Sequence, residues 1–566
     1  MVGSVRVVRL TDLPTETVAG LLRARAGDGH PALLFEDQQF SWAELVASAD
    51  QRAGLLRRLR RPGPFHVGVL LDNVPEYLWL IAGAAMAGAA IVGINPTRRG
   101  GELAHDIRHT DCQLIITDRD HLPLLEGLDT GVVSDRVLLA DDPGYRGALA
   151  ETAQPALSET EPVSPSDRLL LLFTSGSTGA PKAVVCTQGR LAAIAQRTPP
   201  MFGITRQSVT YQAMPLFHGN ALMANWAPVL ATGATMAMRR RFSASGFLPD
   251  VRRYHATFFN YVGRSLAYIL ATPTTEQDLD NDLILGFGTE ASARDMATFR
   301  RRFGCELLEN YGSSEGAIST QKTADTPDNS IGAPPPGVDV AVVDPNTREE
   351  CPPARFDADG RLINGDRAIG ELVGRNVSTA FEGYYNNPEA DAERLRHGWY
   401  WSGDLGYRDE DGWLYFAGRG GDWLRVDSEN FAAGPVERIL SRYPPAVMVA
   451  VYPVPDPRTG DQVMATLELE PGTTLDPDDL RSFLDDQADL GAKWMPRFVR
   501  VSPSMPLTAS NKVEKHRLRS QGWADAGSDT VYWQPARGDA YRVLTDADAD
   551  RLRSEFAEHG RQALLG

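Results

Sequence analysis

Hydrophobic positions with helical spacing first appear over residues 40–57. One face of this segment carries Leu45, Ala49, Ala53 and Leu56, which recur every three or four positions. Ser41 precedes them and is a suitable N-cap, because its hydroxyl can accept a backbone N–H from the first turn. The pattern predicts a helix with one face packed on a hydrophobic core.

Short apolar runs alternate with such helical segments in the first part of the chain. The clearest are residues 66–71, 113–117 and 169–173. Continuous apolar strands separated by helices are typical of parallel sheets covered on both faces. The pattern therefore predicts an α/β fold with a large N-terminal domain built from parallel-sheet subdomains.

Residues 77–94 form an uncharged apolar run that approaches the length of a membrane-spanning helix. Gly83, Gly88, Gly93 and many alanines favour close packing inside protein instead, and an Asn-Pro pair then ends the segment. The chain has no second such run, and no positive cluster flanks this one. We interpret it as a buried helix that runs into a buried strand, and we expect no integral membrane association.

The clearest domain boundary is the glycine-rich stretch at 418–422. Three glycines within four positions follow an expected strand at 413–416, and they can absorb large backbone changes. Helix and strand patterns continue beyond it at 435–443, 446–452, 463–469 and 477–486. We predict a large domain over residues 1–419 and a small, mobile α+β domain with a tail over residues 420–566.

The composition of the 566-residue chain is that of a globular protein, and its formal net charge is −17. This balance argues against nucleic acid as a partner and against docking on anionic lipid, because both need a basic face. Four cysteines without CxxC spacing indicate neither a zinc site nor a redox motif, and they suit a reducing compartment. The N-terminus has no apolar signal core, so we expect a cytoplasmic protein. The oligomeric state is left open.

The most informative stretch is residues 169–182, LLLLFTSGSTGAPK, in which an apolar strand leads directly into a loop rich in glycine and hydroxyl groups. Glycines let successive backbone N–H groups turn toward one anion, the hydroxyls add donors, and Lys182 adds charge. This combination suits a polyphosphate. It is not a GxxxxGK[ST] P-loop, because Pro181 stands where that motif needs glycine. A flexible Ser/Gly linker is the structural alternative, but a linker does not explain the fused strand.

TSGSTGAPK resembles the signature loop of the adenylate-forming superfamily, which comprises acyl-CoA synthetases, peptide-synthetase adenylation domains and luciferases. Further motifs similar to those of the superfamily follow in order over nearly the whole chain. They are PLFHG at 215–219, YGSSE at 311–315, SGD at 402–404, GR at 418–419, and Lys512 in LTASNK at 507–512. Six motifs in register make a chance resemblance implausible.

The resemblance implies that an acid oxygen attacks the α-phosphorus of ATP and that pyrophosphate leaves. Cations and donors aimed at the phosphoryl oxygens lower the barrier of such a step. The ATP-binding residues implied are Thr174, Ser175, Gly176, Ser177, Thr178, Gly179, Lys182, Glu290, Tyr311, Gly312, Ser314, Asp404, Arg419 and Lys512. Among them, Tyr311 would lie against adenine, Asp404 would accept both ribose hydroxyls, and Ser314 would touch the α-phosphate.

The catalytic residues that the resemblance implies are Thr174, Lys182, His218, Glu315 and Lys512. Glu315 would bind Mg²⁺, a cation that prefers oxygen ligands, and Lys512 would reach from the small domain to the acid and the α-phosphate. Each has an ordinary alternative when taken singly: a solvated loop acid for Glu315, a surface lysine for Lys512, a core histidine for His218. Their position within the ordered set favours function.

The stretches 258–263 and 285–290 resemble the very-long-chain acyl-CoA synthetase and fatty-acid transport protein-like branch, as do 419–425 and 531–533. This resemblance implies a substrate pocket formed by His218, Asn260, Tyr261, Phe287, Gly288 and Thr289. It also implies coenzyme A as co-substrate. The leading hypothesis is a fatty or aromatic acid–CoA ligase that adenylates its acid and, after the small domain rotates about residues 421–422, forms a thioester.

Several positions depart from that branch. Thr289 stands where Asn is usual, Asn260 where Gln is usual, and Asp427-Ser428 precede Glu429 where the branch has the glycine of GEN, at a loop that lines the thiol channel. These changes leave open a second hypothesis, in which nitrite is activated without coenzyme A and an aromatic amine attacks to give a diazo product. A third hypothesis, a non-catalytic fatty-acid uptake protein, gives Lys512 and Glu315 no role. Pocket depth is also left open.

Overall fold

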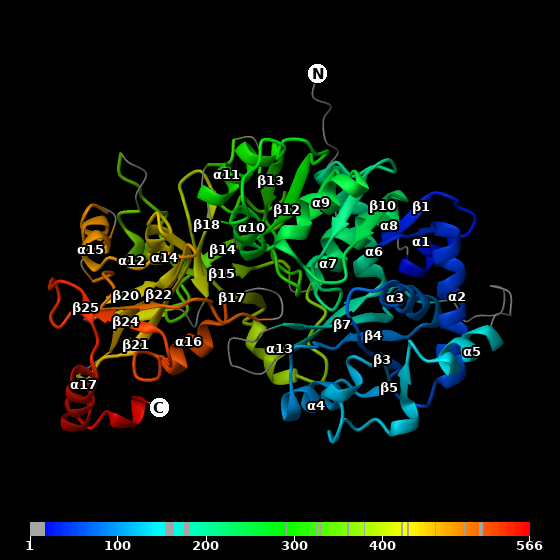
Figure 1. Ribbon diagram of the computed structural model, residues 1–566, viewed down its shortest axis with the longest axis horizontal. Coiled ribbons are helices and arrows are strands. Elements are labelled where there is room, and N and C mark those ends of the chain that lie inside the picture. The colour runs from blue at the N-terminus through cyan, green and yellow to red at the C-terminus, as the bar shows by residue number, and fades with distance from the viewer. Residues whose placement is uncertain are drawn as a thin grey trace.

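The computed structural model describes residues 17–152, 163–174, 182–289, 291, 293–323, 325–327, 330–358, 362–377, 380–419, 423–426, 429–458, 460–487, 490–491, 493–508 and 513–565. Figure 1 shows two lobes: a large one that runs from blue through green, and a smaller one in orange and red. The chain is a mixed α/β protein with a large N-terminal and a small C-terminal part, as the pattern of apolar runs predicts.

One parallel sheet has the strand order β6-β5-β3-β4-β7-β8, and only its β7–β8 pair is antiparallel. Its strands are β3 (His66–Leu70), β4 (Ala90–Gly93), β5 (Cys112–Thr117), β6 (Val137–Leu139), β7 (Arg168–Thr174) and β8 (Lys182–Thr187). The three apolar runs predicted as strands are β3, β5 and β7. β3 is buried along its whole length, because helices cover both faces of such a sheet.

A second sheet has the order β13-β12-β11-β9-β10-β1-β2 and is parallel except for β1–β2. Its strands are β1 (Pro31–Phe35), β2 (Gln38–Ser41), β9 (Val209–Gln212), β10 (Thr235–Met238), β11 (Phe258–Asn260), β12 (Leu285–Gly288) and β13 (Glu306–Glu309). β11 and β12 carry residues predicted for the substrate pocket. Parallel neighbours end at one edge, so their last residues come together there.

Helices pack around these two sheets in Figure 1. They are α1 (Val18–Arg23), α2 (Trp42–Leu59), α3 (Pro75–Ala87), α4 (Gly100–His109), α5 (Pro143–Glu151), α6 (Gln188–Phe202), α7 (Gly219–Ala221), α8 (Ala227–Thr232), α9 (Ala244–Tyr254), α10 (Gly263–Leu270) and α11 (Ala293–Phe303), with short turns at Leu122–Leu124, Ser134–Arg136 and Leu222–Trp226. The predicted cap of α2 is present: Ser41 Oγ accepts the Glu44 N–H at 3.2 Å, and the Glu44 carboxylate accepts the Ser41 N–H at 2.7 Å.

The uncharged run at 77–94 is buried inside the large lobe, as predicted. It forms α3, which ends at Gly88 with φ +68°, and then β4. Gly83 lets α3 approach α2, since a Cβ at this position would lie 2.6 Å from the Cβ of Arg52. Within the described part of the chain, no helix combines the length and the apolar character needed to cross a membrane.

A third, antiparallel sheet connects the large lobe to the small one. Its order is β14-β15-β17-β16, with β18 on β17. The elements are β14 (Val340–Val343), α12 (Gly365–Ala368), β15 (Gly370–Gly374), α13 (Pro388–Arg394), β16 (Leu395–Arg396), β17 (Trp399–Arg408) and β18 (Leu414–Arg419). The predicted domain boundary at 419/420 falls between β18 and the next strand, and it stays a prediction.

The small lobe is α+β. It contains β19 (Trp423–Val426), β20 (Glu429–Ala432), α14 (Ala433–Leu440), β21 (Ala446–Pro455), β22 (Asp461–Leu469), α15 (Pro477–Asp485), β23 (Phe498–Val501), α16 (Lys515–Gln521), β24 (Thr530–Trp533), β25 (Arg542–Val543), α17 (Asp546–Glu558) and a final turn at Gln562–Leu565. β21 to β25 form one sheet in which only β22–β23 is parallel. Of the segments predicted to carry helix and strand patterns, 435–443 overlaps α14 and 477–486 overlaps α15.

Candidate active site

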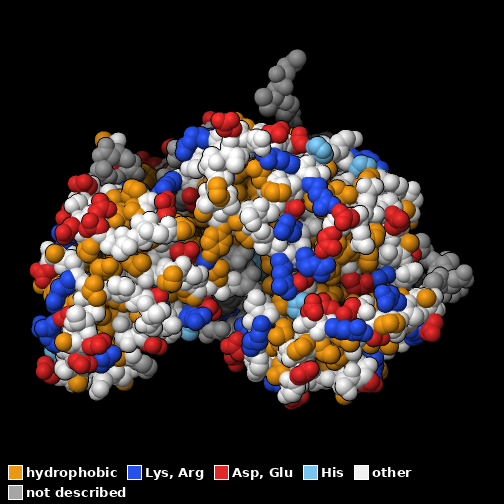
Figure 2. Space-filling view, in the orientation of Figure 1, with side chains coloured by type: hydrophobic (Ala, Val, Ile, Leu, Met, Phe, Trp, Pro, Cys, Tyr) orange, Lys and Arg blue, Asp and Glu red, His pale blue; other side chains and the backbone are white. Residues whose placement is uncertain are grey.

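A cleft of about 3510 Å³ lies where the two lobes meet, and both of them contribute lining residues. Figure 2 shows the surface hollowed between the lobes on the face in view. Ten predicted site residues line this cleft: Thr174, Lys182, His218, Phe287, Thr289, Tyr311, Gly312, Ser314, Glu315 and Asp404. Residues separated by more than two hundred positions in the chain therefore border one space.

The β7–β8 hairpin forms one end of the cleft. Thr174 is the last residue of β7, Lys182 is the first of β8, and the two are register partners. The predicted phosphate-loop residues between them, Ser175, Gly176, Ser177, Thr178 and Gly179, lie outside the described residues. The hairpin brings both ends of the loop to the cleft, which is where a bound polyphosphate would need them.

Lys182 is a buried cation at this end, with only 5% of the residue exposed. Its Nζ lies 3.0 Å from Glu393 Oε2 in α13 and 5.4 Å from the centre of the Tyr384 ring. A lysine with one partly exposed carboxylate as ion-pair partner can exchange that partner for an anionic ligand. This arrangement is compatible with the predicted anion-binding role of Lys182, which stays a prediction.

Glu315 is a buried carboxylate held by Tyr384. The Tyr384 hydroxyl donates to Glu315 Oε1 at 2.8 Å and accepts from Arg394 Nε at 3.2 Å. Burial, and then the Glu315 carboxylate, raise the pKa of Tyr384 well above its ordinary value, so its hydroxyl stays a donor. Tyr384 and Arg394 are site residues that the sequence reading missed, because neither stands in one of the six motifs.

The Glu315 carboxylate suits a divalent cation that takes most of its ligands from phosphate and water. Such a cation is commonly held by one or two protein carboxylates. The described residues contain no group of three or more His, Cys, Asp and Glu side chains arranged for a metal. Glu315 is buried, yet it lines the cleft and one of its oxygens has a donor. The site can thus hold Mg²⁺ through Glu315 only if the nucleotide supplies further oxygens.

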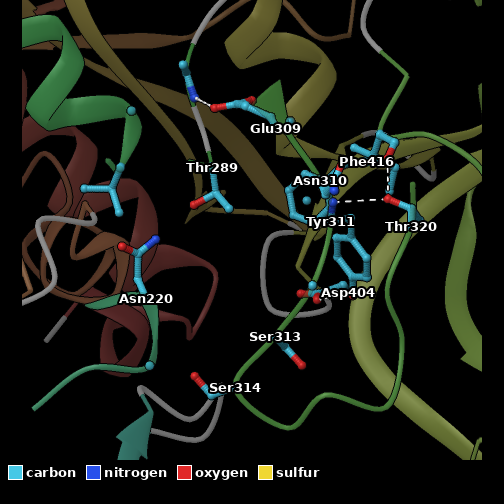
Figure 3. A pocket seen from close by; sticks show the side chains of 18 of the residues that line it. Asn220, Thr289, Glu309, Asn310, Tyr311, Ser313, Ser314, Thr320, Asp404 and Phe416 are labelled. Atoms are coloured by element: carbon cyan, nitrogen blue, oxygen red, sulfur yellow. Dashed lines mark hydrogen bonds between the residues drawn. The ribbon is translucent and has the colours of Figure 1, made fainter. Parts of the chain in front are cut away.

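Tyr311 and Asp404 form the next part of the wall. The Tyr311 hydroxyl donates to Asp404 Oδ2 at 2.6 Å, and the Tyr311 N–H donates to Thr320 Oγ1 at 3.1 Å. Figure 3 shows Tyr311, Asp404 and Phe416 together on one side of the pocket. Burial, and then the Asp404 charge, raise the pKa of Tyr311 well above its ordinary value. An aromatic face beside a carboxylate suits a base and its ribose.

Ser314 comes close to the histidine motif. A Cβ placed on Gly219 would lie 3.1 Å from Ser314 Oγ, so the glycine makes room for this hydroxyl. The Ser314 carbonyl oxygen accepts from Arg190 Nη2, which fixes the backbone here. Gly219 directly follows His218, so the predicted α-phosphate contact and the predicted acid pocket adjoin each other.

His218, Phe287 and Thr289 line the part of the cleft predicted for the acid. Its wall is largely apolar: the Phe287 ring lies 4.5 Å, centre to centre, from Phe202 at the end of α6. Further apolar lining residues are Ile194, Met201, Met223, Ala267 and Leu270. This side of the cleft can accept a large hydrocarbon group.

Asn260, Tyr261 and Gly288 do not line this cleft but lie directly behind it. The Asn260 amide accepts from Asn225 Nδ2 at 2.8 Å and donates to Asn220 Oδ1 at 2.6 Å. Asn220, which the sequence reading missed, lines the cleft in its place, and Figure 3 shows it on the same side as Thr289. Tyr261 packs against Gly288, where a Cβ would lie 2.4 Å from the ring.

Besides the phosphate loop, three predicted residues have no described side chain. Glu290 and Lys512 lie outside the described residues, and Arg419 is described only as the backbone partner of Asp404 in the β17–β18 pair. Gly312, next to Tyr311, lines the cleft. The residues that flank the lysine segment, Leu507, Thr508 and Val513, also line it. The roles predicted for Lys512, Glu290 and Arg419 stay predictions.

The cleft has room for a nucleotide beside Lys182, Tyr311 and Asp404 and for an apolar group beside Phe287. The chain belongs to the AMP-binding enzyme family: the family model matches residues 22–385, and the model of the AMP-binding enzyme C-terminal domain matches residues 435–512. The resemblance to the adenylate-forming superfamily is thereby confirmed.

Two relatives match over most of their length. The chain is 52% identical over 555 residues to the steroid-22-oyl-CoA synthetase of Rhodococcus jostii strain RHA1. The alignment covers 98% of this chain and 100% of that protein. It is 43% identical over 520 residues to the medium/long-chain-fatty-acid–CoA ligase FadD17 of Mycobacterium tuberculosis. This alignment covers 90% of this chain and 97% of that protein.

Solved structures show the same fold. The chain superposes on an anthranilate CoA ligase in complex with anthranoyl-AMP with a TM-score of 0.79 and 22% identity, covering 91% of this chain and 98% of that one. At this identity the likeness shows the fold alone.

Proposed function

We propose that the chain is an AMP-forming acid–CoA ligase whose acid carries a large apolar group. The observation that carries the proposal is one cleft bordered by Lys182, Glu315, Tyr311, Asp404 and His218. In the first step a carboxylate oxygen of the acid bonds to the α-phosphorus of ATP, and pyrophosphate leaves. In the second the CoA sulfur bonds to the carbonyl carbon, and AMP leaves.

Each residue's place in the cleft indicates which part of the substrates it contacts. Lys182 and the loop before it hold the β- and γ-phosphates, where developing charge is neutralised. Glu315, oriented by Tyr384, holds Mg²⁺, and this cation supplies charge neutralisation when it is bound. Tyr311 faces the base, and Asp404 accepts the ribose hydroxyls. Lys512 contacts the reacting groups from the small domain.

The apolar wall and the relatives' names together support the substrate class. Phe202, Phe287 and Met223 border the acid side of the cleft, and the two relatives are named for steroid and medium- to long-chain fatty acids. A buried apolar group contributes about 25 cal/mol per Å² removed from water, so a large skeleton gains most in such a pocket. Membership of the very-long-chain acyl-CoA synthetase and fatty-acid transport protein-like branch stays a prediction, supported by its motifs.

Three further predictions belong to the proposal. They are a cytoplasmic location, no nucleic-acid partner, and a boundary at 419/420 between a nucleotide-binding domain and a small domain that moves. The net charge of −17 supports the second.

Pyrophosphate release tests the function directly. Purified protein is assayed with ATP, Mg²⁺ and a series of acids: a C22 steroid acid, dodecanoate, benzoate and acetate, each with and without CoA. We expect the steroid acid or dodecanoate to have the highest kcat/KM and mass spectrometry to find the acyl-CoA. Turnover that ignores CoA, or that needs nitrite plus an aryl amine, would contradict the ligase.

A further inference from the structure

Arg264 is a buried cation where the large lobe meets the small one. It lies in the first turn of α10, and 3% of its side chain is exposed. Val262 and Gly263, just before it, line the acid side of the cleft, and the Gly263 N–H donates to the Thr289 carbonyl oxygen at 2.8 Å. The backbone that carries Arg264 therefore also shapes the acid pocket.

The Arg264 guanidinium contacts the small lobe. Nη2 lies 3.7 Å from Glu468 Oε2 in β22, and Nη1 donates to the Met505 carbonyl oxygen at 3.4 Å. The same Glu468 oxygen accepts the Met505 N–H at 2.8 Å, and 10% of the Glu468 side chain is exposed. One buried carboxylate thus joins a cation of the large lobe to the backbone of the small lobe.

Tyr268 holds the guanidinium from the large-lobe side. Its hydroxyl accepts from Arg264 Nη2, and the guanidinium carbon lies 4.7 Å from the centre of its ring. A planar guanidinium stacked on a ring keeps few orientations, so its direction toward Glu468 is set in advance. Removing either member of such a buried pair leaves the other charge unmatched, which is costly.

Met505 leads into the segment that carries Lys512. Leu507 and Val513 pair in an antiparallel bridge, and the Glu514 N–H donates to the Pro506 carbonyl oxygen at 2.9 Å. Leu507 and Val513 also line the cleft. Both flanks of residues 509–512 are therefore tied, through Met505 and Glu468, to the cation beside the acid pocket.

We propose that Arg264 is a positioning residue for adenylation: its ion pair with Glu468 holds residues 505–508 and 513–514, the described flanks of the predicted lysine, at the cleft. The inference rests on the proposed function, because it assigns the contact to the first of its two half-reactions. Arg264 acts through Met505 on residues 505–508 and 513–514, which flank the predicted catalytic lysine. The predicted rotation of the small domain breaks the pair before CoA reacts, so the second half-reaction does not need it.

Two half-reaction assays separate these roles. Acid-dependent exchange between pyrophosphate and ATP measures adenylation, and thioester formation from a synthetic acyl adenylate plus CoA measures the second step. For Arg264→Met and Glu468→Gln we expect exchange to fall about 100-fold in kcat, as for a misplaced catalytic group. Thioester formation should stay within about twofold of the parent, because it does not use the docked pose.

Arg294→Met is the matched control. Arg294 Nη1 also reaches the small lobe, donating to the Pro444 carbonyl oxygen at 3.2 Å, but the contact is exposed. This variant should change neither assay. Arg264→Lys keeps the charge and should recover part of the exchange activity, which a purely structural role does not predict.

The outcomes are separable. If Arg264→Met does not fold, as thermal unfolding reports, Glu468→Gln decides, because its amide oxygen can still accept the Met505 N–H. Equal loss in both assays, or unchanged exchange in either variant, overturns the role of Arg264. A parent protein that lacks both half-reactions refutes the ligase itself.

Discussion

Tyr384 joins the charges at the phosphate end of the cleft. It donates to Glu315, accepts from Arg394, and lies beneath the ammonium of Lys182. Removing a group that orients a metal-binding carboxylate typically costs about 10- to 100-fold in metal affinity or activity. At the scale of single residues, this tyrosine is therefore the best test of the site outside the six sequence motifs.

Tyr384→Phe removes the donor and keeps the ring. We expect the Mg²⁺ concentration for half-maximal pyrophosphate release to rise about tenfold or more, because Glu315 loses its orientation. Tyr385→Phe is the matched control, since the Tyr385 hydroxyl donates to Asp111 at 2.7 Å instead. An equal change in both variants would mean that the effect comes from packing.

Tyr311→Phe tests the ribose end of the cleft. Removing the donor to Asp404 should raise the KM for ATP about fivefold, the size of one hydrogen bond of about 1 kcal/mol. Because the pKa of Tyr311 is raised, its hydroxyl keeps its proton at pH values where an ordinary tyrosine begins to lose it. The parent's KM for ATP should therefore stay level from pH 7 to 9.5. Tyr407→Phe, at a cleft-lining ring on the same strand as Asp404, is the control. A KM for ATP that climbs across this range would contradict the assignment.

At the scale of elements, α13 supplies the ion-pair partner of Lys182, the lysine that we propose holds the phosphates of ATP. Glu393 in α13 pairs with Lys182 while 58% of its side chain is exposed. Glu393→Gln should therefore lower the KM for ATP, by about two- to fivefold, because Lys182 no longer exchanges an exposed ion pair for the phosphates. Glu389→Gln, an exposed carboxylate on the same helix, should leave the KM unchanged. A higher KM in Glu393→Gln would show that this carboxylate helps to bind the nucleotide.

Helix α4 contains a buried acid with a testable pH dependence. Burial raises the pKa of Asp106 to about 6, against the opposing charge of Arg98. Because the pKa of Asp106 is higher in the folded than in the unfolded protein, the protonated acid adds to the free energy of unfolding at pH values below its unfolded-state pKa. This contribution is lost as the pH rises through about 6. Asp106→Asn mimics the protonated form. Its stability relative to the parent should rise by about 1 kcal/mol between pH 5 and pH 8.

Denaturant unfolding at the two pH values measures this difference. Asp129→Asn is the control, because 86% of the Asp129 side chain is exposed. A relative stability of Asp106→Asn that is the same at both pH values would show that the acid is ionised in the folded protein at pH 5.

At the scale of the whole molecule, one ligand should stabilise both lobes, because both line the cleft. A non-hydrolysable acyl-sulfamoyl adenosine at about 100 times its Kd should add about 2.7 kcal/mol to the free energy of unfolding. Hydrogen exchange should slow in α6 of the large lobe and α16 of the small lobe. Adenosine alone is the control. Protection confined to α6 would mean that the small lobe does not contribute to the bound state.

Much of the fold could be predicted from local pattern. The capped helix α2, the buried run that became α3 and β4, and the strands β3, β5 and β7 each follow from side chains within about twenty neighbouring positions. The superfamily was likewise readable, because its motifs occur in order. The predicted pocket was only partly accurate at the level of single side chains: Asn260 supports Asn220 from behind, and Asn220 carries no distinctive local signal.

The sequence by itself determined the fold class, the elements named above and the superfamily, since periodicity and short motifs depend on neighbouring residues. Tertiary structure decided which charged groups meet. Lys182 and Glu393 are 211 positions apart, Tyr311 and Asp404 are 93 apart, and Arg264 contacts Met505 across 241. Such contacts arise only when separate sheets and lobes pack together, and no local pattern specifies which partners that packing will bring within hydrogen-bonding distance.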